Sequence, residues 1–439
     1  MKVIRFIIVL AFIISSVYAS DKEKWYRLIG SAFLDNSSYR VLEKICYEAG
    51  GRLAGSEQNK KAMSILEEEL KKLGLTPRRE SFTMPGWQRG EDRVFMTTPS
   101  NYEIRAAALG YTDKTPEINS GLVYIGNGKE EDYEGIDVKG KVILANQGYA
   151  ANGKQFLRCE AIDVAASKGA AAILFINEKN GGLLMAGVAN FIGEPSPIPA
   201  YTITMEDGLR MKRLLEMKSE VSLRIITNSR CTGKISEENL VVNFPGNSKK
   251  KLVAGVHFDS WDLSQGAIDN GHGTAIAFET ARLLHQFSRE NGLTIDIVWF
   301  NAEELGLWGS KAYVEQHKSE DIAAMINLDM TGIPTGFNAM GFDEFKPFLE
   351  NLCKELNGFD MKDGVSSTPY TNSDHMYFIM EGIPSFTIHA HLEKDMYWYY
   401  HDFGDTFDKV EKKYFSEAGA VLSILRSEEH TSELQSPNT

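Results

Sequence analysis

Residues 252–262, Leu-Val-Ala-Gly-Val-His-Phe-Asp-Ser-Trp-Asp, followed by Gly266-Ala267-Ile268-Asp269-Asn270, decide the fold of this chain. The first five are apolar and β-prone, which predicts a strand, and a histidine and two acids stand where that strand would end. Side chains alternate between the faces of a strand, so His257 and Asp259 point the same way. Asp269 precedes an apolar helical pattern, so a chain that turns out of the strand could return its carboxylate to the same edge. The segment therefore predicts a metal site at the carboxyl end of a strand.

Two later strand-like runs also end in acids, namely Glu303-Glu304 and Asp329. The elements concerned are the strand-like residues 294–300 and 322–328 and the helical residues 274–289 and 306–317. Their alternation predicts an α/β fold, a doubly wound and mostly parallel sheet covered by helices on both faces. Ligands of open α/β sheets bind beyond the carboxyl ends of the strands. We therefore expect these acids and His257 to converge on one crevice.

The side chains at the strand ends are those that zinc prefers, carboxylate oxygen and imidazole nitrogen. His401 adds a second histidine late in the chain. Two histidines and several acids are too many for one tetrahedral ion, and they suit two ions about 3.5–4 Å apart that share a bridging carboxylate. In the adjacent pair Glu303-Glu304, one carboxylate can bind metal while the other acts as general base towards water. The sequence therefore predicts two Zn²⁺ ions.

Five short motifs stand in a fixed order along the chain: His257-x-Asp259, Gly-Ala-x-Asp269-Asn270, Asn-Ala-Glu303-Glu304-x-Gly, Asp329 and His401-x-x-x-Asp405-Thr406. In these motifs the chain resembles the co-catalytic zinc exopeptidases, a family that includes bacterial leucyl aminopeptidase, glutamate carboxypeptidase and carboxypeptidase Q. The run Asp259-Ser-Trp-Asp-x-x-Gln-Gly-Ala and the early Gly51-Arg-Leu-Ala-Gly-Ser56 are most similar to the carboxypeptidase Q branch. The resemblance covers roughly the whole mature chain and implies the zinc exopeptidase fold.

The resemblance also implies which side chains hold the metals. His257 and Asp329 would bind one zinc ion. Glu304 and His401 would bind the other, and Asp269 would bridge the two. The sequence therefore contains every protein ligand that the resemblance implies for the two ions.

Four further acids have implied or expected roles near the metals. By the resemblance, Glu303 is the general base and Asp259 orients His257 from behind. We expect Asp405 to hold the loop of His401, and Asp374 to cap the helix that follows it, with a role in the site as the alternative. Glu303 and Asp259 are therefore the predicted catalytic residues.

Composition changes divide the chain into domains. Residues 20–116 and 233–426 are predicted to form the catalytic domain, and residues 117–232 an insert. Gly140-Lys-Val-Ile-Leu and Ala165-Ala-Ser-Lys-Gly-Ala-Ala-Ala-Ile-Leu in this insert resemble a protease-associated domain. We therefore expect a second, smaller domain between strands of the catalytic sheet.

The two ends of the chain are predicted to lie outside the mature fold. Lys2 and Arg5 precede an apolar run that is too short to span a membrane, so residues 1–19 are interpreted as a secretory signal. The expected location is secreted or periplasmic, with no membrane span after cleavage. Residues 427–439 are polar throughout and resemble translated adapter sequence, so we expect a non-native tail there.

The overall composition is that of a globular protein. The chain has 439 residues, 43% of them hydrophobic, and a net charge of −13 without a basic stripe, which disfavours nucleic-acid binding. The four cysteines are scattered and are expected to be free thiols, with a Cys159–Cys231 pair as the alternative. The predicted partner is a short peptide substrate, and the sequence leaves a homodimer open.

The predicted function is an exported zinc-dependent exopeptidase that hydrolyses dipeptides or a terminal residue of short peptides. Two alternatives are a catalytically silent zinc-binding receptor-like protein and an acyltransferase of glutaminyl-cyclase type on the same fold. A silent protein should lack a ligand or the base, and none is missing here. The acyltransferase normally has one zinc ion and no insert, and no Gly-x-Ser-x-Gly motif indicates a serine hydrolase.

Overall fold

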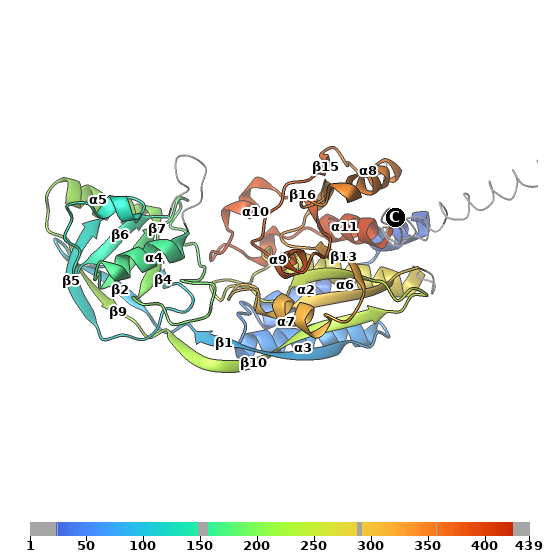
Figure 1. The fold of residues 1–439 in the computed structure, drawn as a ribbon, viewed down its shortest axis with the longest axis horizontal. Coiled ribbons are helices and arrows are strands. Elements are labelled where there is room, and N and C mark those ends of the chain that lie inside the picture. The colour runs from blue at the N-terminus through green and yellow to red at the C-terminus, as the bar shows by residue number, and fades with distance from the viewer. Residues whose placement is uncertain (1–22, 24, 148–156, 288–291, 357, 425–439) are drawn as a thin grey trace, which may run out of the picture.

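The computed structural model describes residues 23, 25–147, 157–287, 292–356 and 358–424. Two lobes lie next to each other along the long axis of the molecule, each built on its own eight-stranded sheet (Figure 1). One lobe contains the predicted metal-site strands and the other the predicted insert. The expected α/β fold with an inserted second domain is confirmed.

The sheet of the catalytic lobe is parallel at its centre, and an antiparallel pair joins each flank to this centre. In sheet order its strands are β1 (Arg78–Gln88), β10 (Arg230–Phe244), β12 (Thr294–Phe300), β11 (Lys251–His257), β13 (Ile322–Asn327), β16 (Ser385–His391), β14 (Ile333–Asn338) and β15 (Gly364–Ser366). Strands β12, β11, β13 and β16 run parallel to one another, so their carboxyl ends meet at one edge. The three predicted metal-site strands agree with β11, β12 and β13 to within a residue or two.

Helices cover both faces of this sheet. They are α2 (Ser37–Glu48), α3 (Glu57–Lys72), α6 (Gly271–Phe287), α7 (Trp308–Gln316), α8 (Lys346–Glu355), α9 (His375–Met380), α10 (Lys394–Trp398) and α11 (Lys413–Ile424). Ala254 and Val256 pack into the core beneath α2, α6 and α11. Val253 faces the opposite way, towards Tyr313 of α7 and Phe378 of α9. Because both faces are buried, the central strands are mostly apolar rather than alternating, with Asp296 in β12 and Asn327 in β13 as buried polar exceptions.

The sheet of the inserted lobe has the order β3 (Tyr102–Ile104), β2 (Arg93–Thr98), β9 (Ser222–Ile226), β5 (Ile118–Tyr124), β6 (Val142–Asn146), β7 (Ala172–Ile176), β8 (Ala200–Ile203) and β4 (Ala106–Ala108). Helices α4 (Arg158–Ser167) and α5 (Met205–Glu216) pack on β7. Strands β2, β3 and β4 precede residue 117, where the insert was predicted to begin. β2 joins this sheet through an antiparallel pair with β9 and β4 through one with β8, each about a hundred residues away, and such distant pairing leaves no local signal. β3 pairs with β2.

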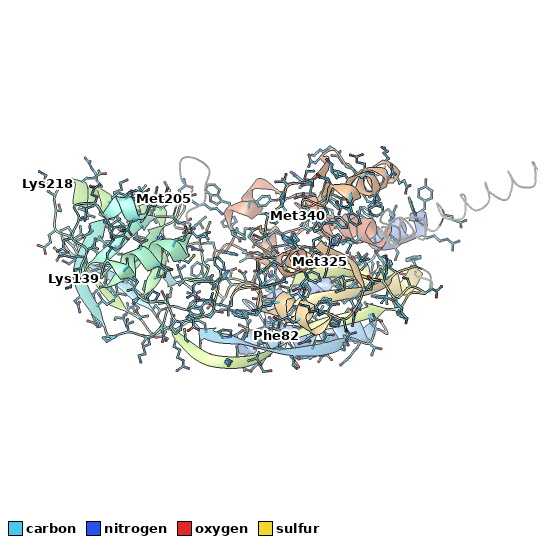
Figure 2. The ribbon with its side chains drawn as sticks, viewed as in Figure 1. Phe82, Lys139, Met205, Lys218, Met325 and Met340 are labelled. Atoms are coloured by element: carbon cyan, nitrogen blue, oxygen red, sulfur yellow. The ribbon has the colours of Figure 1, made fainter. Side chains whose placement is uncertain are left out.

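The two lobes are joined by a long antiparallel ribbon. Strand β1 pairs with β10 from Arg78 opposite Val241 to Gln88 opposite Arg230, and the ribbon passes from one lobe to the other (Figure 1). Side chains fill both lobes: Lys139 and Lys218 mark the inserted lobe and Met325 the catalytic lobe (Figure 2).

Some sequence predictions concern residues outside this description. The predicted signal, residues 1–19, and the predicted tail, residues 427–439, both lie outside the described residues. Among the helices that are described, none is long and apolar enough to cross a membrane. All four cysteines are free thiols, as expected, and Cys159 does not pair with Cys231.

Candidate metal centre

Five side chains meet at the carboxyl edge of the catalytic sheet. His257 is the last residue of β11, Glu304 follows β12 and Asp329 follows β13. Asp269 comes from the turn before α6, and His401 from the loop after α10. All five residues predicted as ligands are therefore brought together, from segments up to 144 residues apart in sequence, since 401 − 257 = 144.

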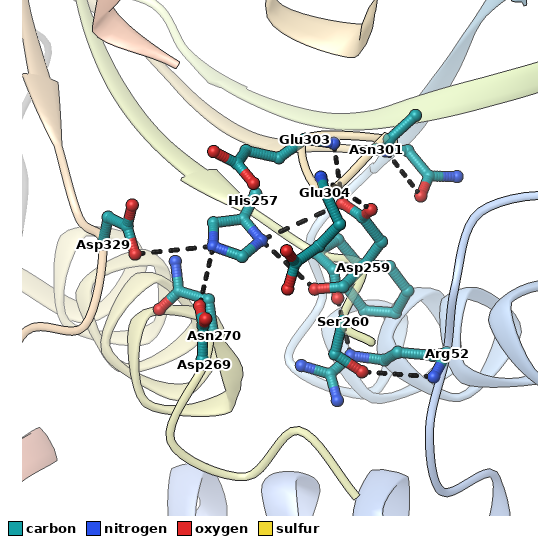
Figure 3. Close-up of polar contacts among 12 residues, drawn as sticks. Arg52, His257, Asp259, Ser260, Asp269, Asn270, Asn301, Glu303, Glu304 and Asp329 are labelled. Carbon is teal, nitrogen blue, oxygen red and sulfur yellow. Dashed lines mark hydrogen bonds and ion pairs between the residues drawn. The ribbon is translucent and has the colours of Figure 1, made fainter. Parts of the chain in front are cut away.

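The five side chains form two groups that share Asp269. Figure 3 shows His257, Asp269 and Asp329 of the first group, together with Glu304. In the first group, His257 Nε2 lies 3.1 Å from Asp269 Oδ1 and 3.4 Å from Asp329 Oδ1. In the second group, His401 Nε2 lies 3.0 Å from Asp269 Oδ2 and 3.1 Å from Glu304 Oε2. The two oxygens of Asp269 thus face different histidines, which is the arrangement that a bridging carboxylate needs.

The chemistry of the cluster fits divalent cations. Asp269 Oδ2 and Glu304 Oε1 are buried without a hydrogen-bond donor, and buried carboxylate oxygens are costly unless a cation or donor compensates them. Burial lowers the pKa of His401, but Glu304 and Asp269 outweigh it and raise the pKa to about 10. The cluster therefore has an excess of negative charge. Nitrogen and oxygen donors in this mixture are typical of zinc.

Each histidine is oriented through its other ring nitrogen. His257 Nδ1 donates to the carbonyl oxygen of Asp259 at 3.2 Å, and His401 Nδ1 donates to the carbonyl oxygen of Ala186 at 3.2 Å. A carbonyl oxygen can only accept, so Nδ1 must carry the proton in both rings. Nε2 of each ring is then available to a metal ion on the side of the acids.

Asp259 has a different contact from the one implied by the family resemblance. Its carboxylate lies 3.9 Å from His257 Nδ1, beyond hydrogen-bond distance. Instead it accepts from the backbone N–H of Glu303 at 3.0 Å and of Glu304 at 3.2 Å. The carboxylate therefore holds the turn that carries both glutamates, while the backbone carbonyl of Asp259 orients His257 (Figure 3).

Glu303 lies beside the first group, on a turn with unusual backbone geometry. Ala302 has φ +63°, a left-handed conformation that is uncommon outside glycine and clusters at functional sites. Burial raises the pKa of Glu303 well above its ordinary value; His257 opposes this shift, and Glu304 and Asp329 add to it. A carboxylate with a raised pKa is better able to accept a proton near neutral pH.

A network of buried amides supports this turn, and sequence reasoning missed it. Asn301 and Asn59 exchange two side-chain hydrogen bonds, at 2.9 and 3.0 Å. Asn301 Nδ2 also donates to Glu237, and its backbone N–H donates to Asn239 Oδ1. The Asn301-Ala302 pair ahead of the glutamates was the only sequence signal for it.

Asp405, which lies on the His401 loop, ties that loop to the turn of the shared acid, and Asp374 differs from expectation. The Asp405 carboxylate accepts from the backbone N–H of Ile268 at 2.6 Å and of Asp269 at 3.0 Å, and so also positions Asp269. Asp374 makes no capping hydrogen bond to α9, which corrects the capping prediction. Its side chain is fully buried, and burial, with Asp259 and Asp329 nearby, raises its pKa to about 7.

Two residues outside the predicted set also belong to this region. Arg52 is fully buried and donates to the carbonyl oxygens of Phe258 at 2.5 Å and Gln265 at 2.9 Å, which brings positive charge behind the acids. The ring of Tyr400 stacks on His401 with centroids 3.7 Å apart. Burial and the neighbouring carboxylates raise the pKa of Tyr400 well above its ordinary value.

Comparison with known proteins agrees with this geometry. Residues 239–425 match the family described as Peptidase family M28, and residues 116–211 match the PA domain. The fold and the site define a metallo-exopeptidase. Within these ranges the chain is similar to peptidase family M28, with a PA domain ahead of the matched catalytic residues.

Several relatives span nearly the whole chain. Carboxypeptidase Q of Bos taurus is 28% identical over 89% of this chain and 84% of its own length. Aminopeptidase YwaD of Bacillus subtilis is 26% identical over 89% of this chain and 84% of its own length. Among solved structures, a peptidase M28 precursor from Shewanella amazonensis has a TM-score of 0.80 at 23% identity, covering 96% of this chain and 98% of that one. BSAP, a zinc aminopeptidase from Bacillus subtilis, has a TM-score of 0.69 at 25% identity, covering 89% and 93%.

Proposed function

We propose that this chain is a zinc-dependent exopeptidase that uses two metal ions to hydrolyse dipeptides or a terminal residue of short peptides. The observation that carries the proposal is the pair of three-residue groups that share Asp269 beside Glu303. Peptidase family M28 supports the reaction class, and the zinc aminopeptidase from Bacillus subtilis supports the metal.

Each residue of the centre has a proposed role. His257, Asp269 and Asp329 would hold one ion, and Asp269, Glu304 and His401 the other. Zinc ions, when bound, polarise a scissile carbonyl and lower the pKa of water. Glu303 would take a proton from that water and deliver it to the leaving amine.

The proposed substrate has a free α-amine. Acids dominate the centre, and a protonated amine needs an acidic partner where a carboxylate would need a cation. The inserted lobe supplies one candidate cation, Lys179, whose Nζ lies 5.8 Å from the centroid of the Tyr400 ring. Lys179 Nζ already donates to the carbonyl oxygen of Tyr397 at 2.7 Å, so the balance of charge still favours amine recognition.

The alternative functions have less support. A silent receptor-like protein would not need a complete ligand set together with a raised pKa at Glu303. A glutaminyl-cyclase-type acyltransferase would not be expected to keep both ligand groups and an insert. We also propose that the enzyme is exported to the periplasm or the cell exterior, on the basis of residues 1–19.

The test is metal-dependent turnover on a panel of dipeptides. Protein stripped of metal with a chelator should be inactive, and addition of Zn²⁺ should restore hydrolysis at about two ions per chain. Full activity in the stripped protein, or full activity at one ion per chain, would contradict the proposal. An assay of glutamine cyclisation on the same samples tests the alternative that the protein is an acyltransferase.

A further inference from the structure

A segment of the inserted lobe contacts the loop that carries His401. The backbone N–H of Ala186 donates to the carbonyl oxygen of His401 at 3.0 Å, and His401 Nδ1 donates to the carbonyl oxygen of Ala186 at 3.2 Å. The next residue of the loop, Asp402, accepts from the backbone N–H of Leu184 through its carboxylate. Two consecutive residues of the catalytic lobe, His401 and Asp402, are thus bonded to the inserted lobe.

His401 needs this support because its backbone is in the left-handed region, with φ +57°. That conformation costs roughly 1 kcal/mol or more for a non-glycine residue and persists only where surrounding structure enforces it. The bond from the Ala186 N–H to the His401 carbonyl is one such restraint. By contrast, His257 is the end of a central strand, and its Nδ1 acceptor lies only two residues away at Asp259.

The Ala186 carbonyl is itself held in place by a half-buried cation. Arg158, the first residue of α4, donates from Nη1 to the Met185 carbonyl at 2.9 Å and from Nη2 to the Ala186 carbonyl at 3.1 Å. Burial lowers the pKa of Arg158 to about 10. A side chain on Gly187 would put Cβ 1.8 Å from Arg158 Nη2, so glycine at this position leaves room for the guanidinium.

We propose that Arg158 is a positioning residue for the second metal ion. It fixes the Ala186 carbonyl, which keeps the proton of His401 on Nδ1 and directs Nε2 towards Asp269 and Glu304. The inserted PA domain then completes one metal site and leaves the other, at His257 and Asp329, to the catalytic lobe alone. This inference rests on the proposed two-metal function.

The test measures metal binding rather than turnover. Metal-free wild-type protein and the variant Arg158→Met are titrated with Zn²⁺ against a chromophoric chelator. The wild type should bind two ions. The variant should bind the first ion with unchanged affinity and the second about 10–100-fold more weakly, the usual effect of losing an outer partner of a metal-bound histidine. Arg158→Lys keeps the charge but cannot donate to both carbonyls with the same geometry, so an intermediate loss is expected.

Matched variants identify which site is affected. In Co²⁺-substituted protein, the visible spectrum of Arg158→Met should resemble that of His401→Ala and differ from that of His257→Ala. Arg210→Met is the control, because Arg210 stacks on Tyr102 within the inserted lobe and has no contact with the metal centre. It should bind both ions as the wild type does.

The outcomes separate this inference from the proposed function. A wild type that binds fewer than two ions overturns the two-metal function. A wild type that binds two ions, with folded Arg158→Met binding both equally well, overturns the role of Arg158. If Arg158→Met does not fold, two other variants decide. Gly187→Ala displaces the guanidinium, and Arg158→Lys changes its hydrogen-bond geometry. Unchanged binding of the second ion in both variants would overturn the inference.

Discussion

Glu303 and Glu304 are neighbours in sequence but have different surroundings. Glu304 is bonded to His401 in the second ligand group, whereas Glu303 lies by the first group with a raised pKa. We predict that Glu303→Gln keeps both metals and loses turnover by about 10²–10⁴-fold, because an amide cannot accept the proton. Elemental analysis and steady-state rates on the same preparation measure both quantities.

Glu304→Gln is the matched control for this prediction. It makes the same chemical change one residue away, at a proposed ligand, and should lose metal from the second site as well as turnover. If Glu303→Gln lost metal and Glu304→Gln did not, the two roles would be reversed.

The shared position of Asp269 leads to a second prediction. Its two carboxylate oxygens face His257 and His401, so Asp269→Ala removes a ligand from both proposed sites. The purified variant should contain less metal than Glu303→Ala, which removes no proposed ligand. Inductively coupled plasma mass spectrometry decides the order, and full occupancy in Asp269→Ala would exclude a bridging carboxylate.

Sequence and structure agree on which residues converge but differ on how some of them make contact. The convergence of His257 and Asp329 could be predicted because parallel strands end at one edge. The contacts of Asp259 and Asp405 could not, because each carboxylate binds backbone N–H groups of a distant turn. Backbone donors have no residue identity, so they leave no trace in the sequence.

At the scale of elements, the strands that can be predicted from the sequence are those buried on both faces. Strands β11, β12 and β13 were visible as mostly apolar runs because both of their faces are covered. The ribbon of β1 and β10 is less visible in the sequence, since β10 extends for 15 residues and much of its inserted-lobe half is exposed or half-buried. Its pairing with β1 connects segments more than 140 residues apart in sequence, as 230 − 88 = 142.

The C-terminal end of α7 carries a pH-dependent contact with β1. His317 Nε2 lies 3.1 Å from Glu80 and Nδ1 lies 2.9 Å from Glu320. Burial lowers the pKa of His317, but these two carboxylates outweigh it and raise the pKa above its ordinary value. Because the folded pKa is the higher one, the stabilisation is complete below the unfolded pKa of about 6.5 and is lost as pH rises through the folded value.

We therefore predict that His317→Gln lowers the free energy of unfolding of the catalytic lobe more at about pH 5.5 than at about pH 9. Urea unfolding of the metal-free protein measures this free energy. Metal is removed so that metal binding does not contribute differently in the variant and the wild type. His285→Gln serves as control, because His285 is an exposed histidine near the end of α6. A larger effect of His317→Gln at the higher pH would contradict the raised pKa.

At the scale of the whole molecule, the inserted lobe reaches the metal centre from several sides. The hydroxyl of Tyr111 donates to the carbonyl oxygen of Leu305 at 2.6 Å, one residue after Glu304. Arg89, at the end of the ribbon, bonds both carboxylate oxygens of Asp262. The inserted lobe therefore contacts the segments that carry Glu304 and His401. We expect its position to determine also which charged groups a substrate would meet.

We expect the charged groups of both lobes around the metal centre to decide whether a peptide is cleaved at its amino or its carboxyl end. If acids of the catalytic lobe bind a free α-amine, N-acetylation of a good dipeptide substrate should reduce kcat/KM by about tenfold or more, equivalent to about 1.4 kcal/mol, and C-terminal amidation should have less effect. Lys179→Met should then leave KM unchanged for free and amidated dipeptides alike, as should the control Lys212→Met on the same lobe, where Lys212 lies over Tyr124. If Lys179 instead binds the substrate carboxylate, amidation and Lys179→Met should each raise KM, and their effects should not add, because both remove the same contact. That second pattern would make the enzyme a carboxypeptidase, with the inserted lobe as its specificity element.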